Sequence, residues 1–246
     1  MGGDSIVKIL GICGSPRNGN SHYLLKQALQ QAKEVDPSKV IVSDYSFKGK
    51  TFSPCIACFR CDGSEERRKG ECVIKDDFQD LRDRWIESNA IIYSVPVYHV
   101  NIPGQLKCFL DRLGNTVNRY YSLTSPRFLK VVGAIAQGMC FGAGQELTIL
   151  FLIQHAVLKN CIPVSGDGWE SYFGGCGWTR KERSKDAIKN FYEKGELDAT
   201  VAVNSSRSLG KRVAELALIL NAGGSQLKEF LSKDPNYGPF LEKIQS

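Results

Sequence analysis

Four cysteines within one short stretch are the residues best suited to chemistry. Three are separated by two residues each, and the fourth follows after a spacer of ten residues: Cys55, Cys58, Cys61 and Cys72. Each two-residue step turns the backbone so that the sulfur atoms can converge on one object, and a four-iron cluster is the commonest object for so tight a leading triplet. Zinc is a rival, although structural zinc sites more often pair two separate C-x2-C knuckles. A group of metal-free thiols is the third interpretation.

A second candidate site is the loop GSPRNGNS at residues 14–21, which joins an apolar run at 6–12 to a helical pattern. A helix start offers unpaired backbone N–H groups and the positive end of the macrodipole, so it suits a phosphate. Ser15, Asn20, Ser21 and the guanidinium of Arg17 can add hydrogen bonds to phosphate oxygens. The Walker pattern GxxxxGK[ST] and the Rossmann pattern GxGxxG are absent, which leaves a loop of the kind that flavin mononucleotide (FMN) uses. The alternative is a plain turn with Ser21 as helix cap.

Composition narrows the classes of protein. The chain has 246 residues, 42% of them hydrophobic, and a formal net charge of +6 that is spread along the sequence. The densest basic cluster, at 67–69, follows two glutamates and indicates a solvated loop, so we expect no nucleic-acid partner. Nine cysteines without an export signal favour metal or redox roles over a disulfide framework. No apolar run is long enough to cross a bilayer, so we expect a cytoplasmic protein without membrane contact.

The elements that must position these groups alternate along the chain. Apolar runs at 6–12, 40–47, 90–96, 129–136 and 162–164 indicate strands, and periodic segments at 21–34, from 76, from 103, at 145–159, 186–194 and 208–221 indicate helices. This alternation predicts a doubly wound α/β fold with a parallel sheet. Ligands of such sheets bind beyond the carboxyl ends of the strands. We expect one domain at 1–222, with the cysteine-rich loop 53–74 inserted. Gly223 and Gly224 should end its last helix, before a helical extension at 223–246.

The phosphate loop, GSPR followed by a serine, resembles the first loop of the NADPH-dependent FMN reductases, a flavodoxin-like family. PCIAC at 54–58 and GECVIKDD at 70–77 resemble the iron–sulfur flavoproteins, an FMN-binding branch of that family. The resemblance spans about the first 165 residues. It implies a flavodoxin-like five-stranded sheet of order 2-1-3-4-5, FMN, and a [4Fe–4S] cluster ligated by the four cysteines. The ten-residue spacer is longer than is usual in the branch, and we expect its charged insertion, 63–70, to loop out.

Two further loops follow the third and fourth predicted strands. PVY at 96–98 and NIPGQLK at 101–107 resemble the family segment that cradles the isoalloxazine ring. Asn101 and backbone N–H groups can read the polar edge of the flavin, and Tyr98 can pack beside it. Glycines in the next loop allow the backbone to approach the ring closely. The predicted ring-binding residues are therefore Pro96, Val97, Tyr98, Asn101, Gln137, Gly138, Gly142 and Gly144.

These motifs predict a redox protein in which the flavin does the chemistry. The three histidines form no constellation with a nucleophile, so we expect no catalytic side chain. We expect a flavin-dependent oxidoreductase that passes electrons from ferredoxin or NAD(P)H to a small-molecule acceptor through a [4Fe–4S] cluster on the cysteine loop. The resemblance implies a homodimer or homotetramer. The rivals are a cluster-free NAD(P)H-dependent FMN or quinone reductase, a non-enzymatic electron carrier, and a zinc-stabilised nucleotide-binding module.

Overall fold

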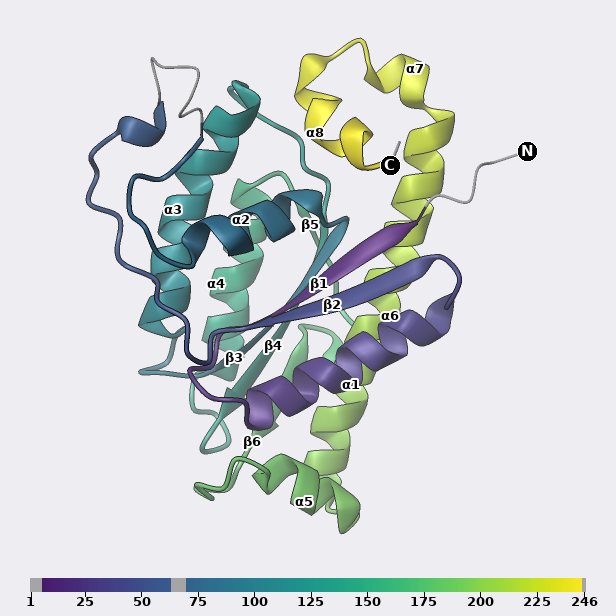
Figure 1. The fold of residues 1–246 in the computed structure, drawn as a ribbon. Helices are drawn as coiled ribbons and strands as arrows, with labels where there is room; N and C mark the ends of the chain where they lie inside the picture. The colour runs from purple at the N-terminus through teal and green to yellow at the C-terminus, as the bar shows by residue number, and fades with distance from the viewer. Residues whose placement is uncertain (1–5, 63–69, 245–246) are drawn as a thin grey trace.

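A parallel sheet forms the centre of the molecule (Figure 1). The computed structural model describes residues 6–62 and 70–244. The strands are β1 (Val7–Cys13), β2 (Val40–Ser46), β3 (Ala90–Pro96), β4 (Val131–Gly138) and β5 (Ile162–Pro163). They are parallel and lie in the order β2-β1-β3-β4-β5. The predicted flavodoxin-like order is confirmed.

A sixth strand, β6 (Gly175–Trp178), was not predicted. It pairs in parallel with the second half of β4, whereas β5 pairs with the first half, so two short strands share one edge of the sheet. Gly174, just before β6, has a φ of +135°, and a Cβ there would lie 2.4 Å from the carbonyl oxygen of Ala134. The glycines that allow this close approach also hide the strand from a search for β-branched residues.

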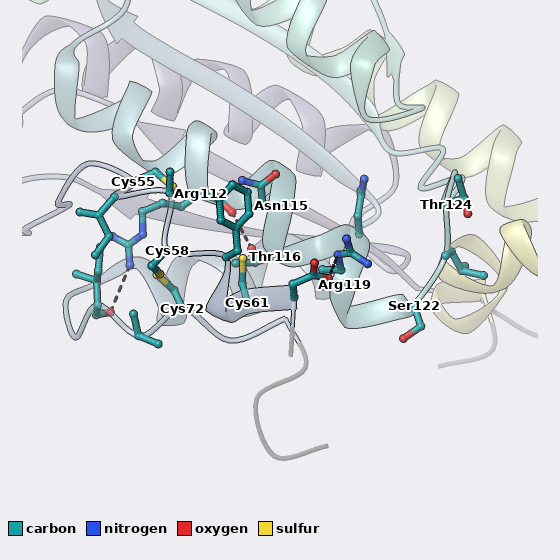
Figure 2. A pocket seen from close by; sticks show the side chains of 18 residues that line it. Cys55, Cys58, Cys61, Cys72, Arg112, Asn115, Thr116, Arg119, Ser122 and Thr124 are labelled. Atoms are coloured by element: carbon teal, nitrogen blue, oxygen red, sulfur yellow. Dashed lines mark hydrogen bonds and ion pairs between the residues drawn. The ribbon is translucent and has the colours of Figure 1, made fainter. Parts of the chain in front are cut away.

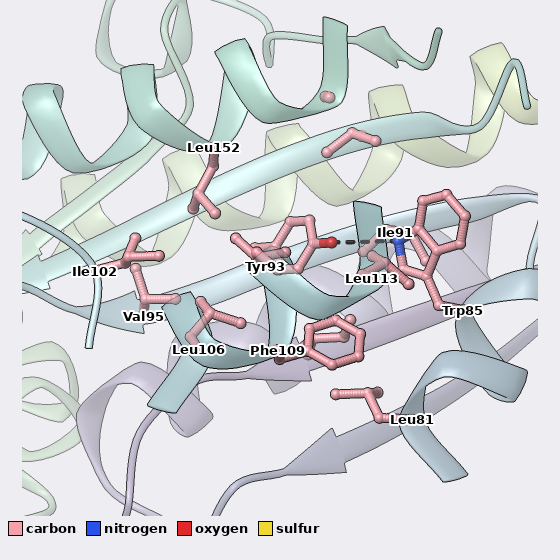
Figure 3. Close-up of a cluster of buried hydrophobic side chains, with 14 of the residues drawn as sticks. Leu81, Trp85, Ile91, Tyr93, Val95, Ile102, Leu106, Phe109, Leu113 and Leu152 are labelled. Carbon is pink, nitrogen blue, oxygen red and sulfur yellow. Dashed lines mark hydrogen bonds between the residues drawn. The ribbon is translucent and has the colours of Figure 1, made fainter. Parts of the chain in front are cut away.

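Helices cover both faces of the sheet (Figure 1). On one face lie α1 (Asn20–Val35) and α6 (Leu197–Gln226), and on the other α2 (Phe78–Glu87), α3 (Gly104–Tyr121) and α4 (Gln145–Leu158). Side chains of β1 alternate between the two cores, as the pleat requires: Ile9 faces α1 and α6, while Leu10 faces α2 and α3. Figure 3 shows the second core, where Trp85 Nε1 donates to the Tyr93 hydroxyl at 3.3 Å.

The last long helix differs from its predicted bounds. It begins at Leu197 instead of 208 and continues through Gly223 and Gly224 to Gln226, so the two glycines do not end it. Packing explains the difference, since a Cβ at Gly224 would meet the ring of Phe240 at 2.6 Å. A predicted short helix is present as α5 (Ala187–Glu193). The expected helical C-terminal region is also present, with α7 (Lys228–Leu231) and α8 (Gly238–Leu241) packing around Leu231, Phe240 and Ile244.

Four short 3₁₀ segments complete the described elements: Arg60–Asp62, Trp169–Ser171, Pro235–Tyr237 and Glu242–Ile244. The first of them lies in the cysteine-rich loop and contacts α3. The predicted insertion at 63–70 falls outside the described residues except for its last member, Gly70. Among the residues that the structure describes, no helix is both long and apolar enough to cross a membrane.

Candidate functional site

The loop between β1 and α1 lies at the carboxyl edge of the sheet, where the fold places ligands. Its hydroxyl and amide residues Ser15, Asn20 and Ser21 are buried, and Arg17 is exposed. Gly19 precedes α1 as its N-cap, and no side chain hydrogen-bonds to the cap in the described structure. The first N–H groups of α1 are therefore left for an anion, with the helix dipole in their favour.

The predicted phosphate-binding residues differ in the hydrogen-bond donors that they keep free for a ligand. Ser15 Oγ accepts a hydrogen bond from the Arg17 backbone N–H at 3.3 Å, so its own hydroxyl proton remains able to donate. Asn20 hydrogen-bonds to α5 and to the segment before it. Its Nδ2 donates to Ser184 O and its Oδ1 accepts from Ile188 N, both at 2.9 Å. One amide proton of Asn20 stays available. The sequence did not predict that Asn20 would join α1 to α5.

The loop after β3 makes a tight turn. Tyr98 and Asn101 exchange both of their backbone hydrogen bonds, at 2.8 and 3.1 Å. The two central residues are left-handed, with φ of +47° at His99 and +59° at Val100, as a two-residue hairpin of the primed type requires. This conformation is costly for a β-branched residue such as Val100. Val97 N donates to Gln137 O at 2.8 Å, so the turn is fixed to the end of β4.

The loop after β4 is joined to that turn. Gly144 has a φ of +98°, and a Cβ there would lie 2.7 Å from Val100 Cα. Gly138 leaves room for Gln145, whose Nε2 lies 2.7 Å from where a Cβ would stand and donates to Cys140 O at 2.8 Å. Gly142 has a φ of +65° and open space around it. The predicted ring-binding residues of β3 and β4, Pro96 and Gln137 included, therefore belong to one connected platform beside the phosphate loop.

The four predicted ligand cysteines line a single cavity of about 670 Å³. Figure 2 shows them gathered beside one face of α3, which contributes Arg112, Asn115, Thr116 and Arg119. All four thiols are free. Burial raises the pKa of Cys61, and the charges of Cys72, Cys55 and Cys58 raise it further. The sequence motif thus corresponds to one place in the fold.

The donor set and the backbone of this loop fit an iron–sulfur cluster. Four thiols are the ligands that such clusters use. Ala57 and Phe59 have left-handed φ values of +50° and +55°, and left-handed residues of this kind occur in the backbone turns that hold anions and Fe–S clusters. Within residues 6–62 and 70–244, no three His, Cys, Asp or Glu side chains are drawn together tightly enough to hold a metal ion. The four cysteines share one cavity, so binding a cluster there requires their side chains to move together.

Two aspartates fasten the base of the cysteine loop, and the sequence had assigned them only to the start of a helix. Asp77 accepts hydrogen bonds from Lys50 Nζ at 2.7 Å and from Thr51 N at 2.8 Å. Asp76 accepts one from Ser53 N at 2.8 Å and forms an ion pair with Arg112 at 2.7 Å. Although burial opposes it at Asp76, these bonds lower the pKa of both carboxyls. The available signal was their position four and five residues after the fourth cysteine, Cys72.

The cysteine cavity and the ring platform lie at different ends of α3. The platform adjoins the start of the helix at Gly104, and the cavity is lined from Arg112 to beyond the end of the helix. At 1.5 Å per residue, these positions begin about 12 Å apart along the helix axis. A cofactor in the platform and a cluster in the cavity of the same chain are thus separate sites.

The comparisons with known proteins identify the family. The profile of the NADPH-dependent FMN reductases matches residues 7–167, well over half of the chain. The chain belongs to this family. Within it, an iron–sulfur flavoprotein of Methanosarcina thermophila is 33% identical over 190 residues, covering 76% of this chain and 91% of the relative. One from Methanocaldococcus jannaschii is 29% identical, covering 87% of this chain and 99% of the relative. This protein is therefore a flavin-dependent oxidoreductase of the iron–sulfur flavoprotein branch.

Solved structures confirm the fold. A flavone reductase superposes with a TM-score of 0.57 at 18% identity, over 86% of this chain and 63% of that one. The chain thus spans less than two thirds of that larger protein. At this identity the likeness bears on the architecture alone. The structural comparison confirms the predicted flavodoxin-like fold, and the sequence profile confirms the predicted FMN reductase family.

Proposed function

We propose that the platform at the carboxyl edge binds FMN. In this proposal the phosphate lies at the start of α1 against Ser15, Arg17, Asn20 and Ser21. The ring lies on Pro96, Val97, Tyr98, Asn101, Gln137, Gly138, Gly142 and Gly144. The uncapped first turn of α1 and the three buried polar side chains beside it support the phosphate position. The left-handed turn at His99 and Val100, held against Gly144, supports a pre-formed seat for the ring.

We further propose that Cys55, Cys58, Cys61 and Cys72 ligate a [4Fe–4S] cluster. The observation that carries this proposal is that all four sulfur-bearing residues line one cavity. The iron–sulfur flavoprotein name of the relatives and the left-handed backbone at Ala57 and Phe59 support it. FMN, when bound, exchanges electrons singly or in pairs, and a cluster exchanges them singly. The proposed reaction is electron transfer from reduced ferredoxin or NAD(P)H to a small-molecule acceptor.

A second copy of the chain completes the proposed route as a homodimer or homotetramer. The outward face of α4 is mostly apolar: Leu147, Leu150, Val157 and Leu158 are exposed at helical spacing around one polar residue, Gln154. A helix that is apolar on every side is normally buried on every side. In the proposed assembly, the cluster of one copy lies near the flavin of its neighbour.

Substitution of single cysteines tests the cluster. We expect Cys72→Ser and Cys61→Ser to lose most of the iron and acid-labile sulfide from anaerobically purified protein while FMN is retained. Cys108→Ser is the matched control, because Cys108 lies on α3 outside the cysteine cavity and should keep its iron. Equal iron content in all three variants would overturn the ligand assignment.

The same samples separate the rival functions. A wild-type protein with bound FMN, no iron and rapid oxidation of NAD(P)H would be a cluster-free reductase. Zinc in place of iron would favour the nucleotide-binding module. Fast reduction by ferredoxin but not by NAD(P)H would assign the donor.

A further inference from the structure

Arg112 holds both ends of the cysteine loop. Its Nη1 donates to the backbone oxygen of Ser53 at 3.2 Å, two residues before Cys55, and its Nη2 donates to that of Ile74 at 3.3 Å, two residues after Cys72. One guanidinium therefore bridges the segments that enter and leave the loop. Figure 2 shows Arg112 reaching from α3 toward these segments beside the cysteines.

The guanidinium is buried in a polarised ion pair. The side chain of Arg112 is 1% exposed and that of its partner Asp76 is 4% exposed, with 2.7 Å between Nη1 and Oδ2. The guanidinium also lies over the ring of Phe78 at 4.1 Å. Arg112 is among the described residues that line the cysteine cavity, and Asp76 is not. The positive end of the pair thus faces the cavity, and the negative end is set behind it.

One donor of Arg112 is left over. Its Nε–H is buried and has no hydrogen-bond partner within the described part of the chain. A buried, unsatisfied donor on a cation is costly unless an acceptor or a negative charge comes near it. Water does not screen this charge, so its field acts on whatever the cavity holds.

We propose that Arg112 is a positioning residue for the cluster, which fixes the loop that carries the four cysteines and supplies a buried positive charge favouring the reduced cluster. This inference rests on the proposed function of Cys55, Cys58, Cys61 and Cys72. Reduction adds one negative charge to a cluster held by four thiolates, and a nearby fixed cation stabilises that added charge. A purely mechanical clamp would hold the loop without setting the potential.

Two substitutions with opposite charge effects distinguish these roles. Arg112→Gln removes the cation and leaves Asp76 behind, so we expect the reduction potential to fall. The ratio of reduced to oxidised cluster at a fixed potential should drop tenfold or more, which is about 59 mV for a one-electron couple. Asp76→Asn removes the opposing anion and should raise the potential. A mechanical clamp predicts shifts in the same direction, because both variants loosen the same contacts.

Arg119→Gln is the matched control. Arg119 lies on the same face of α3 and lines the same cavity, but its side chain is 55% exposed and paired with Asp62. Solvent screens such a charge, so its removal should change the ratio by less than threefold. The assay is an anaerobic redox titration of the holoprotein, followed through the electron paramagnetic resonance signal of the reduced cluster, with iron and sulfide measured on every sample.

Each outcome decides between the two roles. A fall for Arg112→Gln, a rise for Asp76→Asn and little change for Arg119→Gln support the inference. Equal shifts for the two arginine variants, or shifts of one sign for Arg112→Gln and Asp76→Asn, overturn it. Where Arg112→Gln loses its cluster, the sign of the Asp76→Asn shift alone decides. A wild-type protein without iron overturns the proposed function and this inference together, whereas a loaded wild type with unshifted variants overturns only the inference.

Discussion

The crossing of α1 and α6 gives a prediction with an internal control. At Gly210 the two helices are so close that a Cβ would lie 2.0 Å from the carbonyl oxygen of Ala28. That oxygen belongs to the backbone of α1, so the clash is relieved only when one helix moves. At Gly223, in the same helix α6, an added Cβ meets nothing within 4 Å. The same substitution should therefore change stability in opposite directions at the two sites.

The magnitudes follow from two opposing effects. Alanine in place of a helical glycine contributes about 1 kcal/mol through the unfolded state and helix propensity. Gly223→Ala should gain most of this, about 0.5–1 kcal/mol. Gly210→Ala gains it as well but suffers overpacking of about 3 kcal/mol, because a packed core does not deform freely. We expect a net loss of about 2 kcal/mol for Gly210→Ala and a difference of about 3 kcal/mol between the two variants.

Urea denaturation of both variants and the wild type, followed by far-UV circular dichroism and by tryptophan fluorescence, measures these free energies. In thermal unfolding, each kcal/mol corresponds to about 2–4 °C for a chain of this length. The two melting temperatures should therefore differ by about 6–12 °C. If Gly210→Ala is as stable as the wild type, the close crossing of α1 and α6 is wrong.

Three further predictions concern the proposed sites and the acid stability of the fold. Ser15→Ala should weaken FMN binding about fivefold to tenfold in a flavin fluorescence titration, because one buried hydrogen bond to the phosphate is lost; unchanged affinity would remove Ser15 from the site. Leu150→Glu should raise the dissociation constant of the oligomer about 100-fold in sedimentation experiments, since it buries an unpaired charge, whereas Ile219→Glu, at an exposed position of α6, should leave assembly unchanged. Burial, aided by Lys159, lowers the pKa of His155 from 6.5 to about 4. The contribution of neutral, buried His155 to the free energy of unfolding is therefore complete above pH 6.5. It is lost as the pH falls toward 4, by up to about 3 kcal/mol. His155→Gln should flatten this acid dependence of the free energy of unfolding.

The sheet order and the main helices were predictable because their signals are local. Strands buried on both faces are continuous apolar runs, and helices such as α1 and α3 carry an amphipathic period of their own. The strand at Gly175–Trp178 was not predicted because its glycines have low strand propensity and are needed for close packing. The bounds of α6 were missed for a related reason: Gly223 and Gly224 are conformationally free in isolation, and the packing of Gly224 against Phe240 is a tertiary contact.

The four cysteines were predictable as a group because their spacing is a local pattern, and the structure brings them to one cavity. The residues around them were not. Arg112 lies in a helix among apolar neighbours such as Phe109 and Leu113, and only the fold brings it to the loop 59 residues earlier in the chain. Asn20 likewise had a local phosphate-binding interpretation, while its bonds to Ser184 and Ile188 depend on the path of a distant segment.

The most direct test of the account is the cofactor content of the anaerobically purified wild-type protein. Visible absorption, released flavin, iron and acid-labile sulfide are measured on one sample. The account predicts about one FMN, four irons and four sulfides per chain, with flavin bands over a broad cluster absorption. Flavin without iron or sulfide would contradict it, because the cysteine cavity would then hold no cluster.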